Sequence, residues 1–466
     1  MSTGIQQWIE HEFANVAFGD ARLDRRFRAI VVDLAGHCGK TLASSFESWS
    51  KIKASYRFFA NKRVTLQTML APHIQRTAER IRNHSAETVL LLQDTTYFDF
   101  GKRKKTDKLD VVGRHGSGTL IKGLMLHNTL ACDVEGLPLG LVDQRFIDRK
   151  ELGVSSGAAD EKESGRWADI VDELKILDFG DTRAVHVMDR EGDAYAVFRQ
   201  ADAVGAHVLV RAQHNRVIDR DDQDENTGDW LFDKLSAKRA QGRTSVRIQI
   251  NDKKKYRTAT LSIVYMTFEM PPPRDAKPDE DGTVAPALSL TAIMAIERGA
   301  SNLQDALCWV LITNLPVTST EEAIEKVQWY ARRWNVEVFH KILKSGCAVE
   351  KAQLRDAERL KNYIVLKSVV AWRLFWLARL REHDPEGSCE EVLEPLEWTL
   401  LYRKIHKTSE VPETPPMIEQ ALIWIAKLGG YIARPSDPPP GVVSQWRGWE
   451  RLAEIVDDYR DICGSS

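Results

Sequence analysis

An α/β fold with helical segments at both ends is predicted from three features of the sequence. The runs at 88–100 and 184–189 are short, apolar and rich in β-branched or aromatic residues without helical spacing, which is typical of buried strands. Strand periodicity returns over 206–313. Helical periodicity marks residues 1–75 and most of the chain after 352. We therefore expect a sheet-containing middle with helical regions before and after it.

The composition is that of a globular protein, with 43% hydrophobic and 28% charged residues among 466. A net charge of −2 does not indicate nucleic acid, so a DNA-binding surface would require uneven charge distribution. The six cysteines form no C-x-x-C pair, which argues against disulfides and zinc. No signal peptide is expected, and the most apolar helix, near 363–380, contains Lys367, Arg373 and Arg379. We expect a soluble, cytoplasmic protein with no membrane partner.

The first 90 residues are locally basic, with 13 Lys and Arg against 8 Asp and Glu. Arg22, Arg25 and Arg26 begin one amphipathic helix, and the cations of 51–63 interleave with Trp49, Tyr56, Phe58 and Phe59. Cations that neutralise phosphates, mixed with aromatic rings, suit DNA contact. A solvated helical bundle fits the same residues equally well.

Two aspartates follow apolar strand-like runs. Asp94 comes after the run that starts at 88, and Asp189 ends the run at 184–189. Between them, an antiparallel hairpin is expected around Glu135-Gly136 and a helix from 160 to about 177. With Glu337 later in the chain, three carboxylates would converge, and they cannot all stay ionised without cations. Hard divalent ions with oxygen ligands solve that problem, so we expect two Mg²⁺ ions, with Mn²⁺ as a substitute.

One helix is predicted over 320–346, with a capping pattern at Thr318/Glu321 or Ser319/Glu322 and an end at Gly346. At about 100° per residue the apolar stripe comprises Ile324, Val327, Ala331, Trp334, Val338 and Ile342. Beside that stripe fall Tyr330, Arg333, Glu337 and Lys344. A solvated face held by i,i+4 pairs of Glu337 with Arg333 and Lys341, at about 0.3 kcal/mol each, is the plain alternative. Further helices are expected at 352–382, 389–405, 415–428 and 442–462.

Five ordered motifs then resemble the DDE transposases of the insertion-sequence IS-four family, and most closely their Tn-five group. The most specific is Y-x-x-R-x-x-x-E-x-x-x-x-x-x-K, within which R-W-N-V-E-V-F-H-K begins at Arg333. Q-D-T-T at 93–96 and D-R-E-G-D at 189–193 are similar to the segments that bear the family's catalytic aspartates. D-E-K-E-S-G-R-W at 160–167 and the terminal L-G-G and W-x-G-W-E-x-L segments also match.

The resemblance implies an RNase H-like core, a mixed sheet flanked by helices, with a β-rich insertion, a helical N-terminal DNA-binding domain and a helical C-terminal dimerisation region. The expected boundaries are 1–75, 76–205, 206–313, 314–375 and 376–466. It also implies cut-and-paste transposition. Two protomers pair the element's terminal inverted repeats, nick them, form and resolve hairpins, and join the ends to target DNA.

Residue roles carry over from the resemblance. It makes Asp94, Asp189 and Glu337 the catalytic, metal-binding acids. The DNA contacts that it implies are Tyr330, Arg333, Lys344, Lys341, Trp309, Arg211 and His214, with Arg22, Arg25 and Arg26 in the N-terminal domain. Trp309 opens a strand, where tryptophan is usually core, but it fits the family's base-stacking tryptophan, which accepts a base flipped out near the cut.

Other classes of protein remain open. A transposase-derived DNA-binding protein or inhibitor would lack strand transfer, although the three intact acids disfavour it. A metal-dependent nuclease sharing the core is disfavoured by the hairpin-specific residues and the dimerisation tail. A glycosidase with paired carboxylates would leave the cations beside Glu337 without a role.

Overall fold

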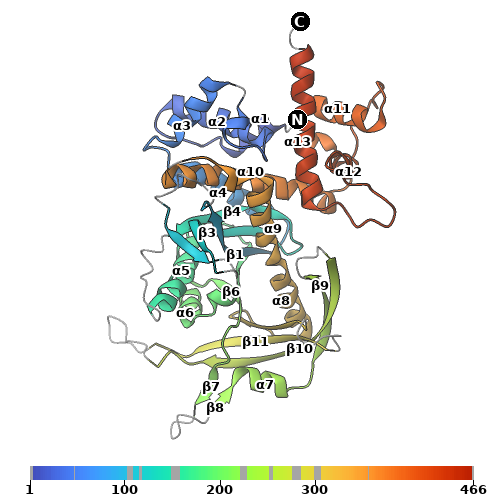
Figure 1. The fold of residues 1–466 in the computed structure, drawn as a ribbon. Coiled ribbons are helices and arrows are strands. Elements are labelled where there is room, and N and C mark those ends of the chain that lie inside the picture. The colour runs from blue at the N-terminus through green and yellow to red at the C-terminus, as the bar shows by residue number, and fades with distance from the viewer. Residues whose placement is uncertain are drawn as a thin grey trace. The chain divides into compact units, whose positions relative to one another are not determined.

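The computed structural model describes residues 4–46, 48–101, 109–114, 118–147, 158–220, 228–250, 255–274, 285–298, 306–354 and 356–463 (Figure 1). They fall into two compact units. The first unit comprises Met1–Asn83, Thr95–Arg149 and Asn335–Ser466. The second comprises His84–Asp94 and Lys150–Trp334. The mixed α/β class predicted from the sequence is confirmed, because both units combine helices with strands.

The first unit begins with four helices, as the helical periodicity predicted. They are α1 (Ile5–Glu12), α2 (Ala21–Gly36), α3 (Trp49–Phe59) and α4 (Leu66–Arg82). The side chains of Asp20, Ser48 and Thr65 accept backbone N–H groups at the starts of α2, α3 and α4. Phe58 and Phe59 are buried, and Phe58 packs against Phe27 of α2. Their expected place among DNA-contacting aromatics is therefore wrong, because their side chains form the core of the helical region.

A β-hairpin follows in the first unit and confirms the turn expected at Glu135-Gly136. It joins β3 (Leu120–Asp133) to β4 (Pro138–Ile147), which pair antiparallel. Asp133 closes the turn, because its Oδ1 accepts the N–H groups of Glu135, Gly136 and Leu137. Gly136 has a φ of 103°, a left-handed conformation that glycine adopts without steric cost. The neighbours of β3 in this sheet are β2 (Val111–Arg114) and β1 (Thr88–Asp99), whose residues from Thr95 on belong to this unit.

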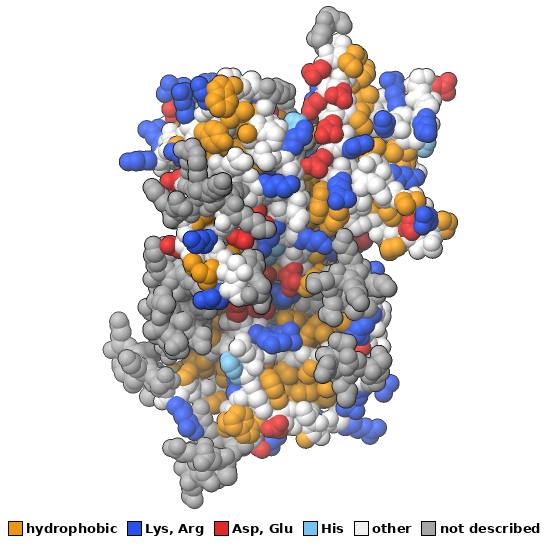
Figure 2. All heavy atoms as spheres, viewed as in Figure 1, with side chains coloured by type: hydrophobic (Ala, Val, Ile, Leu, Met, Phe, Trp, Pro, Cys, Tyr) orange, Lys and Arg blue, Asp and Glu red, His pale blue; other side chains and the backbone are white. Residues whose placement is uncertain are grey.

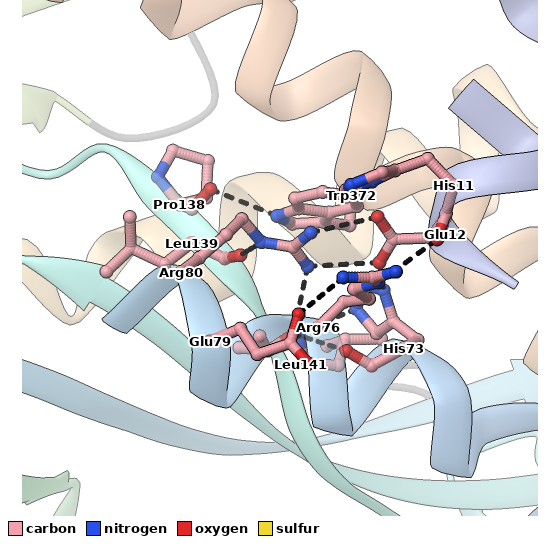
Figure 3. Close-up of polar contacts among 11 residues, drawn as sticks. His11, Glu12, His73, Arg76, Glu79, Arg80, Pro138, Leu139, Leu141 and Trp372 are labelled. Atoms are coloured by element: carbon pink, nitrogen blue, oxygen red, sulfur yellow. Dashed lines mark hydrogen bonds and ion pairs between the residues drawn. The ribbon is translucent and has the colours of Figure 1, made fainter. Parts of the chain in front are cut away.

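A buried polar network ties the N-terminal helices to this hairpin (Figure 3). His73 of α4 accepts the Leu141 N–H at Nε2, 2.9 Å away, so its Nδ1 carries the proton and donates to Glu12 of α1. Arg80 forms a two-pronged ion pair with Glu12 at 2.9 and 3.0 Å. Arg80 also lies over the Trp372 ring, 4.3 Å from its centroid. Burial raises the pKa of Glu12, but Arg80 and His73 outweigh burial and lower it to about 2.

The first unit ends in four long helices, close to the predicted ranges. They are α10 (Ala357–His383), α11 (Pro395–His406), α12 (Ile418–Leu428) and α13 (Val442–Cys463). α10 lies along the N-terminal helices and contacts α2, α3 and α4 (Figure 1). The C-terminal half of α10 shares one apolar core with α11, α12 and α13, built around Leu393, Leu401 and Leu422. No described helix is both long and apolar enough to cross a membrane.

The second unit is organised by a mixed sheet. Its strand order is β1, β5, β6, β12, β11, β10, β9. β1 (through Asp94), β5 (Arg183–Met188) and β6 (His207–Arg211) are parallel, whereas each later pair is antiparallel. The antiparallel strands are β9 (Gly242–Ile250), β10 (Lys255–Met270), β11 (Leu288–Glu297) and β12 (Cys308–Thr313).

Three helices and a small ribbon complete the core of the second unit. The helices are α5 (Ala158–Leu174), α6 (Tyr195–Val204) and α7 (Leu231–Ala237), and the ribbon pairs β7 (Val217–Arg220) with β8 (Gly228–Trp230). Trp167 of α5 and Phe198 of α6 are buried in one cluster with residues of β5, β6, β10, β11 and β12. Of the D-E-K-E-S-G-R-W motif, the structure describes the side chains from Gly165 on.

The helix expected over 320–346 is interrupted. It consists of α8 (Thr320–Arg332), α9 (Trp334–Lys341) and a π-helical turn, Ile342–Gly346. The capping box of Ser319 and Glu322 is confirmed. The predicted apolar stripe fails at Trp334, which is 46% exposed, although its last member, Ile342, is buried; Val336 and Phe339, which it left out, are buried as well. At the interruption the Arg333 N–H donates a hydrogen bond to the Tyr330 carbonyl, three residues back. α8 and α9 bury different faces, because α8 packs within the second unit and most of α9 within the first.

Candidate active site

Strands β1 and β5 position the two aspartates of the second unit. The strands run parallel, and their paired register ends at Leu92–Val187. Asp189 follows β5 directly and caps the short turn Arg190–Gly192, with its Oδ1 accepting the Glu191 N–H at 2.9 Å. Asp94 lies two residues beyond Leu92 but within β1, which continues to Asp99. The expectation that Asp94 ends its strand is wrong, because β3 lies beside β1 in the sheet and supports its later residues.

Arg333 forms an ion pair with Asp94. Its Nη1 lies 3.2 Å from Asp94 Oδ1, and the two side chains are only 14% and 19% exposed. Burial raises the pKa of Asp189, and the nearby Asp94 carboxylate adds to that effect. Arg333, the Glu191 N–H and Arg211 act in the opposite direction. Two carboxylates therefore repel each other in a partly buried site, with an arginine compensating for their charge.

Trp309 and Tyr330 form a packed aromatic pair in the same unit. Trp309 is the second residue of β12 and is 8% exposed, and Tyr330 of α8 is 5% exposed. Their rings meet edge to face with centroids 5.1 Å apart. Burial raises the pKa of the Tyr330 hydroxyl, while the charges of Arg333 and Arg211 and a hydrogen bond from Arg211 oppose that rise. The sequence analysis expected Tyr330 beside the apolar stripe. In the structure its side chain is buried, so Tyr330 belongs to the buried side of α8.

A further aspartate, which sequence analysis did not single out, organises the loop that carries His214. Asp193 is buried, and its Oδ2 accepts the N–H groups of Gln213 and His214 at 2.6 and 3.2 Å. Its Oδ1 pairs with Arg216 at 2.7 Å. The available signal was the second acid of D-R-E-G-D, four residues after Asp189. Arg211 ends β6 just before this loop and donates to the Cys308 carbonyl at 3.3 Å.

The third predicted acid and two predicted cations lie in the first unit. Glu337 occupies the first turn of α9 and is half-buried. Lys341 ends α9 and is exposed, whereas Lys344 lies in the π-helical turn with its Nζ 5.7 Å from the Phe98 ring centroid. Across the described residues, no group of three or more His, Cys, Asp or Glu side chains is arranged to hold a metal ion.

The donor chemistry of the second unit nevertheless fits a hard divalent cation. Asp94 and Asp189 offer carboxylate oxygens, the ligands that Mg²⁺ prefers. Burial, and to a smaller extent the Asp94 carboxylate, raises the pKa of Asp189 and so disfavours its ionised form, whereas Arg333 and Arg211 favour it. A bound cation would favour the ionised forms of both carboxylates.

The predicted N-terminal cations lie at the start of α2. Arg22, Arg25 and Arg26 are exposed, and Arg22 pairs with Asp20 at 3.1 Å with its side chain 84% exposed. Arg28 points inward instead and donates to the carbonyls of Phe13 and Ala14. Figure 2 shows Lys and Arg side chains gathered over the N-terminal helices on the face drawn.

Paired carboxylates on neighbouring parallel strands suit enzymes that use divalent metal ions in phosphoryl transfer, a class that includes nucleases and polymerases. Family models identify the group. Residues 5–64 match the model for transposase DNA-binding, 126–373 the transposase DDE domain, and 369–465 the transposase Tn5 dimerisation domain. The DDE match covers more than half of the 466 residues, and the chain belongs to the Tn5-like DDE transposases.

Membership has direct consequences for the fold and the chemistry. The DDE domain has an RNase H-like core, and the family depends on divalent metal. The flanking matches make this chain a DNA-binding transposase with a dimerisation domain. The DDE match includes Asp189 and Glu337 but begins after Asp94. Asp94 lies outside the matched range, two residues beyond the last β1–β5 pair, and forms an ion pair with Arg333.

Proposed function

We propose that this protein is a cut-and-paste transposase that binds the terminal inverted repeats of its element, cleaves them through DNA hairpins and joins them to target DNA. The observation that supports this most directly is the Arg333–Asp94 ion pair beside Asp189, within a chain of the DDE family. Burial and the neighbouring Asp94 carboxylate keep the pKa of Asp189 raised although Arg333 and Arg211 oppose the rise, and a buried charge is costly unless it is compensated.

In this proposal Asp94, Asp189 and Glu337 hold two Mg²⁺ ions, for which Mn²⁺ substitutes. Bound there, the ions supply the positive charge that in-line displacement at a phosphate requires. The assignment of Glu337 is supported by the Y-x-x-R-x-x-x-E motif, in which it follows Arg333 by four residues, and by its place within the DDE match. The carboxylates provide the oxygen ligands, and Arg333 balances their charge before the ions arrive.

The remaining predicted side chains would hold DNA. Arg333, Lys341 and Lys344 are the cations nearest to Glu337 in the sequence motif and would contact phosphates. Tyr330, Arg211 and His214 would complete that surface. Trp309 would stack on a base displaced from the duplex during hairpin formation, a contact worth about 1–3 kcal/mol.

The ends of the element would first be captured by the N-terminal helices. The side chains of Arg22, Arg25 and Arg26 are exposed at the start of α2, so they can contact phosphates. We propose domains at 1–75, 76–205, 206–313, 314–375 and 376–466, with the last forming the homodimer of the synaptic complex. The match of 369–465 to a dimerisation domain supports the last of these domains.

The deciding experiment incubates the purified chain with a labelled duplex carrying a terminal inverted repeat and Mg²⁺, followed by a denaturing gel. Hairpins and nicked strands are expected from the parent, whereas Asp189→Ala should bind the end but leave it intact. Mg²⁺-dependent nicking by Asp189→Ala would overturn the assignment of this acid. End binding without cleavage by the parent would instead favour a transposase-derived DNA-binding protein or inhibitor.

A further inference from the structure

Helix α9, which carries Glu337, is held in the first unit by buried polar side chains as well as by apolar packing. Val336 and Phe339 supply the apolar contacts. Two polar residues of α9, Asn335 and His340, are also buried, and they lie on either side of Glu337 in the sequence. Buried polar groups need defined hydrogen-bond partners, so their surroundings restrict the helix more than apolar packing does.

On one side, His340 ends a directed chain of hydrogen bonds. Ser368 donates its hydroxyl hydrogen to the Ile364 carbonyl at 2.8 Å, so it must accept from Gln144 Nε2, also at 2.8 Å. The same Gln144 amide nitrogen donates to Asn128 Oδ1 at 2.7 Å. Asn128 therefore presents its Nδ2 to His340 Nε2, 2.9 Å away, and that ring nitrogen must be an acceptor.

On the other side, Asn335 makes two complementary bonds. Its Nδ2 donates to the Gly136 carbonyl at 3.2 Å, and its Oδ1 accepts from Arg379 Nη2 at 3.2 Å. The hydrogen-bond partners of Asn335 and the network that ends at His340 come from the same two elements. Gly136 and Asn128 belong to the β3–β4 hairpin, and Arg379 and Ser368 belong to α10. A turn of α9 about its own axis would break bonds at both sites.

We propose that His340 and Asn335 are positioning residues, which fix the rotation of α9 and hence the direction of the Glu337 carboxylate. This inference rests on the proposed function, in which Glu337 is a metal ligand. Neither residue touches DNA or metal in the proposal. Each acts by holding the helix in the rotation that presents the acid, as outer partners do for ligands elsewhere.

The test compares His340→Ala and Asn335→Ala with His340→Gln, whose side-chain oxygen keeps an acceptor for Asn128. His73→Ala is the matched control, because His73 is another buried, hydrogen-bonded histidine of the same unit, but it contacts α1 and β4 rather than α9. For each protein, end binding, cleavage rate at saturating DNA, and the rise of melting temperature with added Mn²⁺ are measured.

If the inference is right, His340→Ala and Asn335→Ala bind DNA ends normally but cleave about 10- to 100-fold more slowly and respond less to Mn²⁺. His340→Gln keeps a rate within about threefold of the parent, and His73→Ala loses melting temperature while keeping the Mn²⁺ response. An unchanged Mn²⁺ response in folded His340→Ala and Asn335→Ala would overturn it. If the parent does not cleave DNA at all, the proposed function fails, and the Mn²⁺ response still decides the positioning role.

Discussion

Replacement of Arg333 by glutamine tests the electrostatic design of the site. The Arg333–Asp94 pair is 3.2 Å long, so at an effective dielectric constant of about 20 its gross attraction is about 5 kcal/mol. Part of that is offset by the desolvation of two side chains that are 14% and 19% exposed, and a charged hydrogen bond of this kind contributes about 1–3 kcal/mol net. Arg333→Gln should therefore destabilise the metal-free protein by about 1–3 kcal/mol.

The pH dependence of that loss follows from Asp189. Its pKa in the folded chain is raised above the ordinary 3.8, mainly by burial. The folded state therefore keeps the Asp189 proton up to a higher pH than the unfolded state does. Stability therefore falls as the pH rises from about 3.8 through the raised pKa, and the loss is complete above it. Without Arg333, the strongest opposing charge, the pKa of Asp189 rises further and the fall becomes larger.

Divalent ions should stabilise the Arg333→Gln variant more than they stabilise the parent. With Arg333 removed, the two carboxylates lose the charge that most strongly favours their ionised forms, so Mn²⁺ should raise the melting temperature of Arg333→Gln more than that of the parent. The assay is thermal unfolding at a series of pH values with and without Mn²⁺, combined with a double-mutant cycle using Asp94→Asn. A coupling energy near zero between Arg333 and Asp94, or an equal Mn²⁺ response in parent and variant, would refute the reasoning.

Three shorter predictions concern other sites. Reversing the charges of Arg25 and Arg26 should weaken DNA binding across sequences and reduce its dependence on salt, and titrations at several salt concentrations would show an unchanged slope if these residues are only a soluble surface. Trp309→Ala should nick ends normally but form hairpins poorly, with partial rescue by an abasic site, and hairpins at the parent rate on a denaturing gel would leave Trp309 a core residue. Glu12→Gln should be less stable than the parent above pH 4.5. The difference should shrink as the pH falls from 4.5 to about 2, because the pKa of Glu12 is lowered to about 2 in the folded protein and protonation removes its contribution. Thermal unfolding of both proteins at a series of acid pH values would measure this.

Local patterns in the sequence predicted local structure well. The turn at Glu135-Gly136 was predictable because glycine and a flanking acid specify a tight turn, and the capping box at Ser319 because its side-chain contacts span only three residues. Asp94 was misplaced at a strand end because the apolar run stops where pairing with β5 stops, and nothing in the local pattern reveals that β3 lies on the other side. The network around His340 joins residues from positions 128 to 368, and periodicity carries no signal for such contacts.

The last prediction concerns the change of buried face between α8 and α9, which meet at Arg333. One continuous helix over 320–346 would bury the same face along its whole length. That assumption places Trp334 in the core, whereas in the structure Trp334 is 46% exposed and Phe339 is fully buried. Trp334→Ala should therefore change stability by about 0.5 kcal/mol or less, and Phe339→Ala should cost about 3–5 kcal/mol, as thermal unfolding of the full chain would measure. A larger loss from Trp334→Ala would mean that the buried face of α8 continues through α9. Glu337, three residues after Trp334, would then point to the side that the unbroken helix predicts, and the hydrogen bonds of Asn335 and His340 could not be what orients it.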